Sequence, residues 1–278
     1  MTFRNQIIGL MRFSYPSKGG FSPGEQEVAQ AEARLYDPAR LQRRFNLFEQ
    51  LTLPSLLAQA DGDFRMGFLI GRGLPKPWRT RLQDAVAPLR GAKVIALDQL
   101  PHYFATRKAF AQLVSDDATH VTGFRLDDDD AIDIQHIARM RRMVEHLLPL
   151  SGLDRPLVTG CNRGFFLELK PEGNLVYEVA EKQPIGLGLA MTTTREMPEN
   201  IYRRNHRASA QFYNTYTDLG VPAFIRTVHG DNDSTPHASG AVERADWADV
   251  AAAIEANFPF KAEDLRVLCH PLTAAASH

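Results

Sequence analysis

The stretch 119–132, THVTGFRLDDDDAI, decides the fold prediction, because a strand pattern runs directly into four consecutive aspartates. Residues Thr119–Leu126 have the composition of a buried strand. Asp127–Asp130 follow at its carboxyl end, where open α/β sheets bind their ligands. Four adjacent carboxylates repel one another, so they are hard to keep ionised without a cation nearby. The stretch therefore predicts a strand that ends either at a divalent metal site with oxygen ligands or at a solvated turn.

The apolar residues on both sides of the aspartates favour the metal site. Leu126 precedes the run and Ile132 follows it closely, so the run is expected at an element boundary near the core. An EF-hand calcium loop is excluded by spacing. A loop starting at Asp127 would need glycine at 132 and glutamate at 138, where the chain has Ile132 and Ala138.

Composition and charge narrow the class of protein. The chain has 278 residues, 44% of them hydrophobic, which is enough to bury a sizeable core. A net charge of −1 argues against a protein that coats nucleic acid, so no nucleic-acid partner is expected. Cys161 and Cys269 lie far apart in no disulfide or zinc pattern. Without a secretion signal or a stretch of 18 apolar residues, we expect a cytoplasmic protein with no transmembrane segment, and leave peripheral membrane association open.

The first half of the chain predicts an α/β fold with a mostly parallel sheet flanked by helices, because strand and helix patterns alternate. Asp37-Pro38 is typical of a helix start, and apolar residues recur at helical spacing over 41–51. Pro54 should bend or restart this helix. Strands are expected at Ile7–Phe13, Phe64–Ile70, Lys93–Leu97 and Thr119–Leu126, and helices at Trp78–Ala87, Ala105–Val114 and from near Asp133.

The second half predicts mixed α+β structure within the same domain. A hairpin is expected from Gly164–Leu169 and Leu175–Val179, a helix at Arg203–Tyr216, a strand at Phe224–His229 and a helix at Trp247–Phe258. We expect one domain over 1–278, with a ligand-binding half at about 5–132, a second half at about 133–270 and a frayed tail at 271–278.

Three further motifs are candidates for the site. His229-Gly230-Asp231-Asn232-Asp233-Ser234 follows a strand and suits a metal or phosphate site, although these residues are also common in turns.

Arg107-Lys108 would stand at a helix start, where the backbone N–H groups favour an anion, or would be an exposed basic pair. Arg12-Phe13 ends the first strand and offers a cation and a ring to a base and its phosphates, or is an ordinary strand terminus.

Several well-known motifs are absent from the sequence. There is no GxxxxGK[ST] loop, no GxGxxG after the first strand, no HExxH and no GxSxG. These absences argue against P-loop NTPases, Rossmann dehydrogenases, zincins and α/β-hydrolases.

In order, the motifs resemble those of nucleotide-sugar glycosyltransferases with the GT-A fold. Leu53–Gln59 and Asp63–Arg65 are similar to the "SLLxQ…xF" segment of the large family-2 inverting class, and Leu126–Asp129 to its "LDxD" motif. The closer resemblance is to a bacterial family labelled putative rhamnosyltransferases, and it covers most of residues 5–260. It rests on the segments Met11–Tyr15, Tyr36–Leu41, Phe124–Ala131 and His229–Ser234.

The resemblance implies a GT-A, Rossmann-type sheet and a role for each candidate residue. Asp127, Asp129 and His229 would hold Mn²⁺ or Mg²⁺, and Asp127 and Asp128 would also contact the donor. Arg12, Phe13, Arg107 and Lys108 would complete the donor site. The chain departs from the family-2 pattern at Ile70–Gly73, where that class usually has an acidic base-binding motif. The identity of the nucleotide therefore stays open.

The implied reaction is transfer of a sugar, rhamnose in the labelled family, from a nucleotide-diphosphate donor to a saccharide or glycoconjugate acceptor. An inverting enzyme needs a carboxylate base, for which Asp130, Glu178 and Asp231 are candidates, with Asp130 preferred because it adjoins the metal motif. A nucleotidyltransferase acting on a sugar phosphate is an alternative, but Gly19-Gly20-Phe21 matches its glycine-rich loop poorly. A third possibility is a non-catalytic binding module in which the aspartates hold a structural cation.

Overall fold

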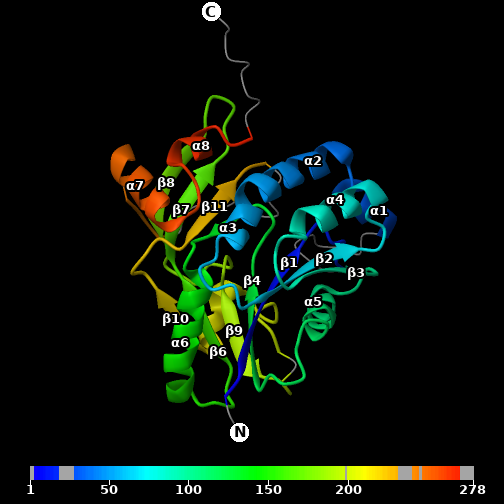
Figure 1. The fold of residues 1–278 in the computed structure, drawn as a ribbon, viewed down its shortest axis with the longest axis vertical. Helices are drawn as coiled ribbons and strands as arrows, with labels where there is room; N and C mark the ends of the chain where they lie inside the picture. Colours follow the sequence, from blue (N-terminus) through cyan, green and yellow to red (C-terminus); the bar gives the residue numbers. More distant parts are fainter. Residues whose placement is uncertain (1–2, 19–27, 198, 231–239, 244–245, 270–278) are drawn as a thin grey trace, which may run out of the picture.

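The computed structural model describes residues 3–18, 28–197, 199–230, 240–243 and 246–269, which form two sheets with helices packed around them (Figure 1). The larger sheet has seven strands in the order β10-β6-β9-β4-β1-β2-β3, and the smaller has five in the order β12-β8-β7-β11-β5. The strands of the larger sheet are β1 (Asn5–Arg12), β2 (Arg65–Gly71), β3 (Ala92–Leu97), β4 (His120–Arg125), β6 (Leu157–Cys161), β9 (Ala190–Thr194) and β10 (Asn214–Asp218). Those of the smaller sheet are β5 (Ala131–Ile132), β7 (Arg163–Glu168), β8 (Leu175–Ala180), β11 (Phe224–Val228) and β12 (Ala241–Glu243).

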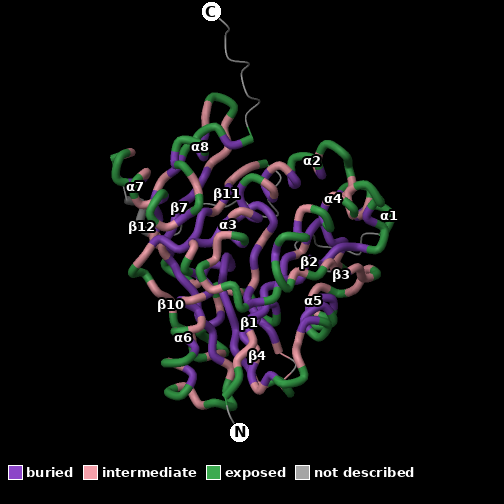
Figure 2. Tube along the Cα trace, viewed as in Figure 1, coloured by how far each residue is buried: buried purple, intermediate pink, exposed green. Residues whose placement is uncertain are grey.

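The larger sheet confirms the expectation of a mostly parallel sheet. Strand β1 pairs in parallel with β2 and β4, and β2 with β3, while β9 runs antiparallel between β4 and β6. Figure 2 shows the buried residues gathered along the strands and the exposed ones on the outer sides of the helices. The helices are α1 (Val28–Leu35), α2 (Pro38–Leu47), the π-helix η1 (Phe48–Thr52), α3 (Leu53–Leu57), α4 (Lys76–Val86), α5 (His102–Ala111), α6 (His136–Ser151), the 3₁₀-helix η2 (His206–Gln211), α7 (Trp247–Asn257) and α8 (Ala262–Arg266).

The long helical segment after Asp37 forms as its sequence predicts. The Asp37 side chain accepts a hydrogen bond from the Arg40 N–H at 2.8 Å, so it caps α2. The segment then continues through the π-helix η1 into α3, which has Pro54 in its first turn. The irregularity expected from the proline therefore takes the form of a π-helical turn, a form common at functional sites.

Two other helix predictions need correction. Residues Arg203–Tyr216 do not form one helix but the short η2 followed by the edge strand β10. Thr215, Tyr216 and Thr217 are strand-favouring residues, and β10 completes its ladder by pairing with β6. Helix α5 also begins earlier than Ala105, at His102 after Pro101. The predicted hairpin and the strand at Phe224 are confirmed by β7, β8 and β11.

The aspartate run lies where the chain passes from one sheet to the other. Strand β4 ends at Arg125 and β5 begins at Ala131, so Asp127–Asp130 form the link between the sheets. Strand β5 pairs antiparallel with β11, with Ala131 opposite Ile225. This pairing brings the end of β11 next to the aspartates.

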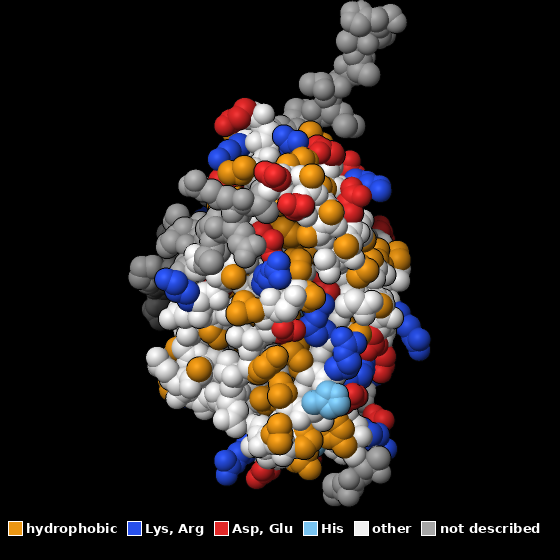
Figure 3. All heavy atoms as spheres, turned by 90° about the vertical axis from the view of Figure 1, so that its left-hand side faces the viewer, with side chains coloured by type: hydrophobic (Ala, Val, Ile, Leu, Met, Phe, Trp, Pro, Cys, Tyr) orange, Lys and Arg blue, Asp and Glu red, His pale blue; other side chains and the backbone are white. Residues whose placement is uncertain are grey.

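No helix in the described part of the chain is both long and apolar enough to cross a bilayer. On the face that carries α6, α7 and β10, hydrophobic side chains are interspersed with charged ones (Figure 3). Leu150, in the last turn of α6, and Leu153, after that helix, are exposed large apolar residues.

Gly164 on β7 is required by close backbone packing. A Cβ atom at this position would lie 2.5 Å from the carbonyl oxygen of Phe224 on β11. Since backbone atoms cannot yield cheaply, we expect Gly164→Ala to lower the free energy of unfolding by about 1–3 kcal/mol, measured by denaturant titration. Gly62→Ala is the matched control, because nothing lies within 4 Å of its added Cβ. Equal stability of the two variants would contradict the prediction.

Candidate active site

Strand β11 and the residues after it hold the aspartate run from one side. The Thr227 N–H donates to Asp130 Oδ1 at 3.0 Å, and the Thr227 hydroxyl donates to the Asp129 carbonyl at 2.9 Å. His229 Nε2 lies 2.9 Å from Asp129 Oδ2. Asp129 and His229, both proposed as metal ligands from the sequence, therefore meet although a hundred residues separate them.

Arg44 of helix α2 holds the run from the other side. Its guanidinium donates from Nη1 to Asp129 Oδ2 at 2.8 Å and from Nε to Asp128 Oδ2 at 3.1 Å, and it also pairs with Asp128 Oδ1 through Nη2. All three residues are buried. Because a buried charge needs a partner, Arg44 stabilises the ionised form of both carboxylates.

The neighbouring carboxylates Asp129 and Asp130 have opposite electrostatic environments. Burial acts to raise the pKa of Asp129, but the charge of Arg44 and the hydrogen bonds from His229 and Arg44 hold that pKa well below its usual range. Burial raises the pKa of Asp130 well above its usual range, and the charges of Asp129 and Asp127 raise it further. Asp129 is thus a stable anion, while the site favours a proton on Asp130.

A small cavity of about 140 Å³ opens beside the aspartates. Asp127 is the most exposed of the four, with 40% of its side chain accessible, and its Oδ2 lies 3.7 Å from Arg125 Nη2. The cavity is below the size of ordinary small-molecule sites, so only part of a ligand of ordinary size would fit inside it. Its charged lining consists of Asp127, Asp128, Asp129, Asp130, Arg12, Arg40, Arg44, Arg125 and Arg226.

The arginines of this cavity come from four different elements. Arg12 ends β1, Arg44 and Arg40 lie on α2, Arg125 ends β4 and Arg226 lies on β11. Only Arg12 was identified from the sequence. Arg125 immediately precedes Leu126 and the aspartates, so its position in the sequence could have predicted it as a residue of the same site. Nothing in the sequence marks the α2 and β11 arginines, because arginine on a helix or strand is usually a solvent-facing residue.

His206, at the start of η2, also lines this cavity. Burial lowers the pKa of its imidazole to about 3, and the charges of Arg125, Arg207 and Arg226 act in the same direction. The ring is therefore neutral at physiological pH and can accept or donate a hydrogen bond.

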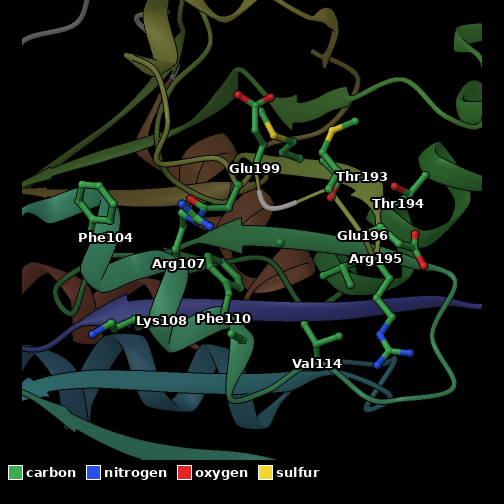
Figure 4. A pocket seen from close by; sticks show the side chains of 16 residues that line it. Phe104, Arg107, Lys108, Phe110, Val114, Thr193, Thr194, Arg195, Glu196 and Glu199 are labelled. Atoms are coloured by element: carbon green, nitrogen blue, oxygen red, sulfur yellow. The ribbon is translucent and has the colours of Figure 1, made fainter.

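Two of the predicted donor-binding positions lie elsewhere. Arg107 and Lys108 are in the middle and last turn of α5, not at its start, and they line a separate cavity of about 540 Å³ between α5 and the segment after β9 (Figure 4). Their predicted position at a helix N-terminus is wrong, because α5 begins a full turn earlier than expected. Phe13 is fully buried against Phe45 and Phe48, so its ring is not available to stack on a base.

The three candidate bases lie in different parts of the chain and of the structure. Asp130 lines the cavity beside Asp129. Glu178 lies on β8 of the smaller sheet, where it is buried and forms an ion pair with Arg163. Asp231 lies outside the described residues, as does the tail 271–278.

Two side chains of the types that bind divalent ions, Asp129 and His229, meet at the aspartate run. Within the described ranges no three His, Cys, Asp or Glu side chains form a group that could hold a metal on their own. Carboxylate oxygens and the imidazole of Asp129 and His229 are nevertheless suitable ligands for Mg²⁺ or Mn²⁺. Mg²⁺ is usually bound by one or two carboxylates together with waters and phosphate oxygens. Asp129 and His229 would thus supply only part of the ligands of such an ion.

Comparisons with solved structures give only distant likenesses. A Staphylococcus aureus TarS structure, residues 1–349 with UDP-GlcNAc, aligns over 84% of this chain and 61% of the TarS chain, at 9% identity and a TM-score of 0.42. This chain thus spans about three fifths of that structure's length. A Desulfovibrio desulfuricans G20 structure, titled a putative nucleotide-diphospho-sugar transferase, aligns over 81% of this chain and 82% of its own, at 8% identity and a TM-score of 0.35. No curated protein sequence matches the chain.

The family comparison covers most of the sequence. The family described as "Putative rhamnosyl transferase" matches residues 6–241. That range includes Arg12, Arg44, the aspartate run and Arg226, which line the cavity, and also His229, which contacts Asp129. It confirms the resemblance inferred from the motifs, and the chain belongs to this putative rhamnosyl transferase family.

Proposed function

We propose that this protein is a glycosyltransferase that binds the diphosphate of a nucleotide-sugar donor in the cavity beside Asp127–Asp130. The observation that carries the proposal is the meeting of Asp129, His229 and several arginines at the carboxyl ends of β1, β4 and β11. Ligands of open α/β sheets bind at this edge. The family description suggests rhamnose as the transferred sugar. The acceptor would be a saccharide or glycoconjugate.

The arginines of the cavity would bind and orient the diphosphate. Guanidinium groups match phosphate oxygens in geometry and carry a permanent charge. Arg12, Arg125 and Arg226 reach the cavity from three strands, so they could contact the phosphates from different directions. Mn²⁺ or Mg²⁺, held by Asp129 and His229 with Asp127 nearby, would neutralise the charge that develops on the leaving diphosphate.

The transfer step would be a single inverting displacement. The acceptor hydroxyl oxygen forms a bond to the anomeric carbon while the bond from that carbon to the diphosphate oxygen breaks. The electron pair of the broken bond stays on the diphosphate, and the hydroxyl proton passes to a carboxylate. Asp130, the base preferred from the sequence, lines the cavity. Because the ligand-free site favours a proton on Asp130, it would act as a base only once the charge of the bound ion lowers its pKa. Asp231 is retained as a candidate, whereas Glu178 is less suitable because it is already paired with Arg163.

Thermal unfolding in the presence of nucleotides tests the proposal. We expect one of UDP, GDP or dTDP, with Mn²⁺, to raise the melting temperature, because a ligand that binds only the folded state at 100 times its Kd stabilises it by about 2.7 kcal/mol. The matching nucleoside monophosphate is the control, since it lacks the second phosphate, and should give a smaller shift. If no nucleoside diphosphate changes the melting temperature with or without metal, the proposed function is wrong.

A further inference from the structure

Arg44 contacts Asp129, the carboxylate that the proposed function assigns to the metal, and also the neighbouring Asp128. Its guanidinium hydrogen-bonds both side chains, and only 8% of the residue is exposed. A single buried cation is therefore shared by two carboxylates of the run and balances one of their two charges. The ligand-free site thus already holds a cation at the carboxylate that would bind the divalent ion.

Arg44 and His229 contact the same oxygen atom of Asp129. Arg44 Nη1 lies 2.8 Å, and His229 Nε2 2.9 Å, from the same atom, Asp129 Oδ2. A divalent ion held by this pair would stand within a few ångströms of the guanidinium. Two cations so close repel each other strongly inside a protein. Arg44 and the ion are therefore competitors for Asp129.

Arg44 borders two cavities. Arg44 lines the cavity beside the aspartates, and it also lines a second cavity of about 390 Å³ whose walls include Leu47, Leu169 and His229. The backbone at this point is fixed, because Leu41, Phe45 and Leu47 of α2 are buried in the core. A rotation of the side chain would carry the guanidinium from the first cavity into the second without moving the helix.

We propose that Arg44 takes the place of the divalent ion in the ligand-free protein. It prevents the ion from binding until the donor diphosphate is bound. The inference rests on the proposed function, because it takes the metal and the nucleotide from it. Without donor, the guanidinium pairs with Asp128 and Asp129 and lowers the affinity of the site for metal. The donor's phosphates then supply the extra negative charge that lets the ion displace Arg44 towards the second cavity.

Mn²⁺ binding to the nucleotide-free protein tests this role. We expect Arg44→Met to bind Mn²⁺ about tenfold or more tightly than the wild type, by calorimetry or electron paramagnetic resonance. Mn²⁺ should also raise the melting temperature of Arg44→Met more than that of the wild type, because the ion replaces the lost cation. Arg44→Lys keeps the charge and should bind Mn²⁺ as weakly as the wild type. Arg44→Gln, which can still donate to Asp128, provides a second uncharged variant should Arg44→Met fail to fold.

If Arg44 only held the aspartates in place, removing its charge would not strengthen Mn²⁺ binding. If the uncharged variants bind Mn²⁺ equally or more weakly than the wild type, Arg44 is not a competitor and the inference is overturned. Arg81→Met is the matched control, since it removes a half-buried arginine paired with Glu49 at 2.7 Å and should leave Mn²⁺ affinity unchanged. A separate titration with UDP, GDP and dTDP in the presence of Mn²⁺ reports on the proposed function. Absence of nucleotide binding there would reject that function, whatever the nucleotide-free Mn²⁺ result.

Discussion

Asp129→Asn should lower kcat/KM for sugar transfer by roughly a hundredfold or more. The change removes the charge of a carboxylate that meets both Arg44 and His229. Loss of one group that stabilises transition-state charge commonly costs a hundredfold to a thousandfold in rate. The measurement is a steady-state assay with the donor identified by thermal unfolding, together with Mn²⁺-dependent nucleotide binding.

Asparagine is chosen so that a loss of activity reports on the charge of Asp129 and not on its size. Asparagine keeps the size of the side chain and leaves Asp128 to pair with Arg44, so the fold should persist. Asp116→Asn is the matched control, because Asp116 is fully exposed and pairs with the surface residue Arg195. Activity of Asp129→Asn within a few-fold of that control would remove Asp129 from the catalytic machinery.

Asp133→Ala should have the largest effect on stability, lowering the free energy of unfolding by about 3–5 kcal/mol. Asp133 is 1% exposed and forms a bidentate pair with Arg139, at 2.7 Å and 2.8 Å. Its loss leaves the Arg139 charge buried without its carboxylate. For a chain of this size the melting temperature should fall by on the order of 10 °C. Asp63→Ala, at an exposed aspartate 3.5 Å from Arg141, should change stability little.

The pH dependence of the Asp133 effect follows from the direction of its pKa shift. Burial acts to raise the pKa of Asp133, but the interactions with His136, 3.7 Å away, and with the hydrogen-bonded guanidinium of Arg139 outweigh it and lower that pKa. A carboxyl whose folded-state pKa is depressed stabilises the protein above its unfolded pKa, and loses this contribution as the pH falls through the folded value. The difference between wild type and Asp133→Ala should therefore shrink below about pH 4. A difference that grows on acidification would contradict the assignment.

A double substitution separates the pair's own contribution from the cost of an isolated charge. Asp133→Leu combined with Arg139→Met should recover much of the stability lost in Asp133→Ala, because apolar replacements of a buried ion pair are often neutral or stabilising. A double variant as unstable as the single one would mean that the lost stability comes from hydrogen bonds to the backbone, such as that from the Gln135 N–H to Asp133.

Local sequence patterns predicted the elements that depend on neighbouring residues. Strand β4 and the aspartates after it follow from a short apolar run that meets four charges, and the β7–β8 hairpin follows from two strand patterns around a glycine-containing turn. The Asp37 cap follows from its side chain and the proline beside it. The segment 203–216 was misread because its strand forms only by pairing with β6.

The sequence by itself determined that this protein is an α/β fold with an acidic site at a strand end, and its motifs indicated the family. Only the tertiary structure decided which cations face that site. Arg44, Arg125 and Arg226 stand there instead of Arg107 and Lys108. The physical reason is that strand patterns depend on alternation between adjacent residues, whereas the site depends on pairing between β5 and β11 and on the rotation of α2 and α5 about their axes. Local composition does not encode either of these.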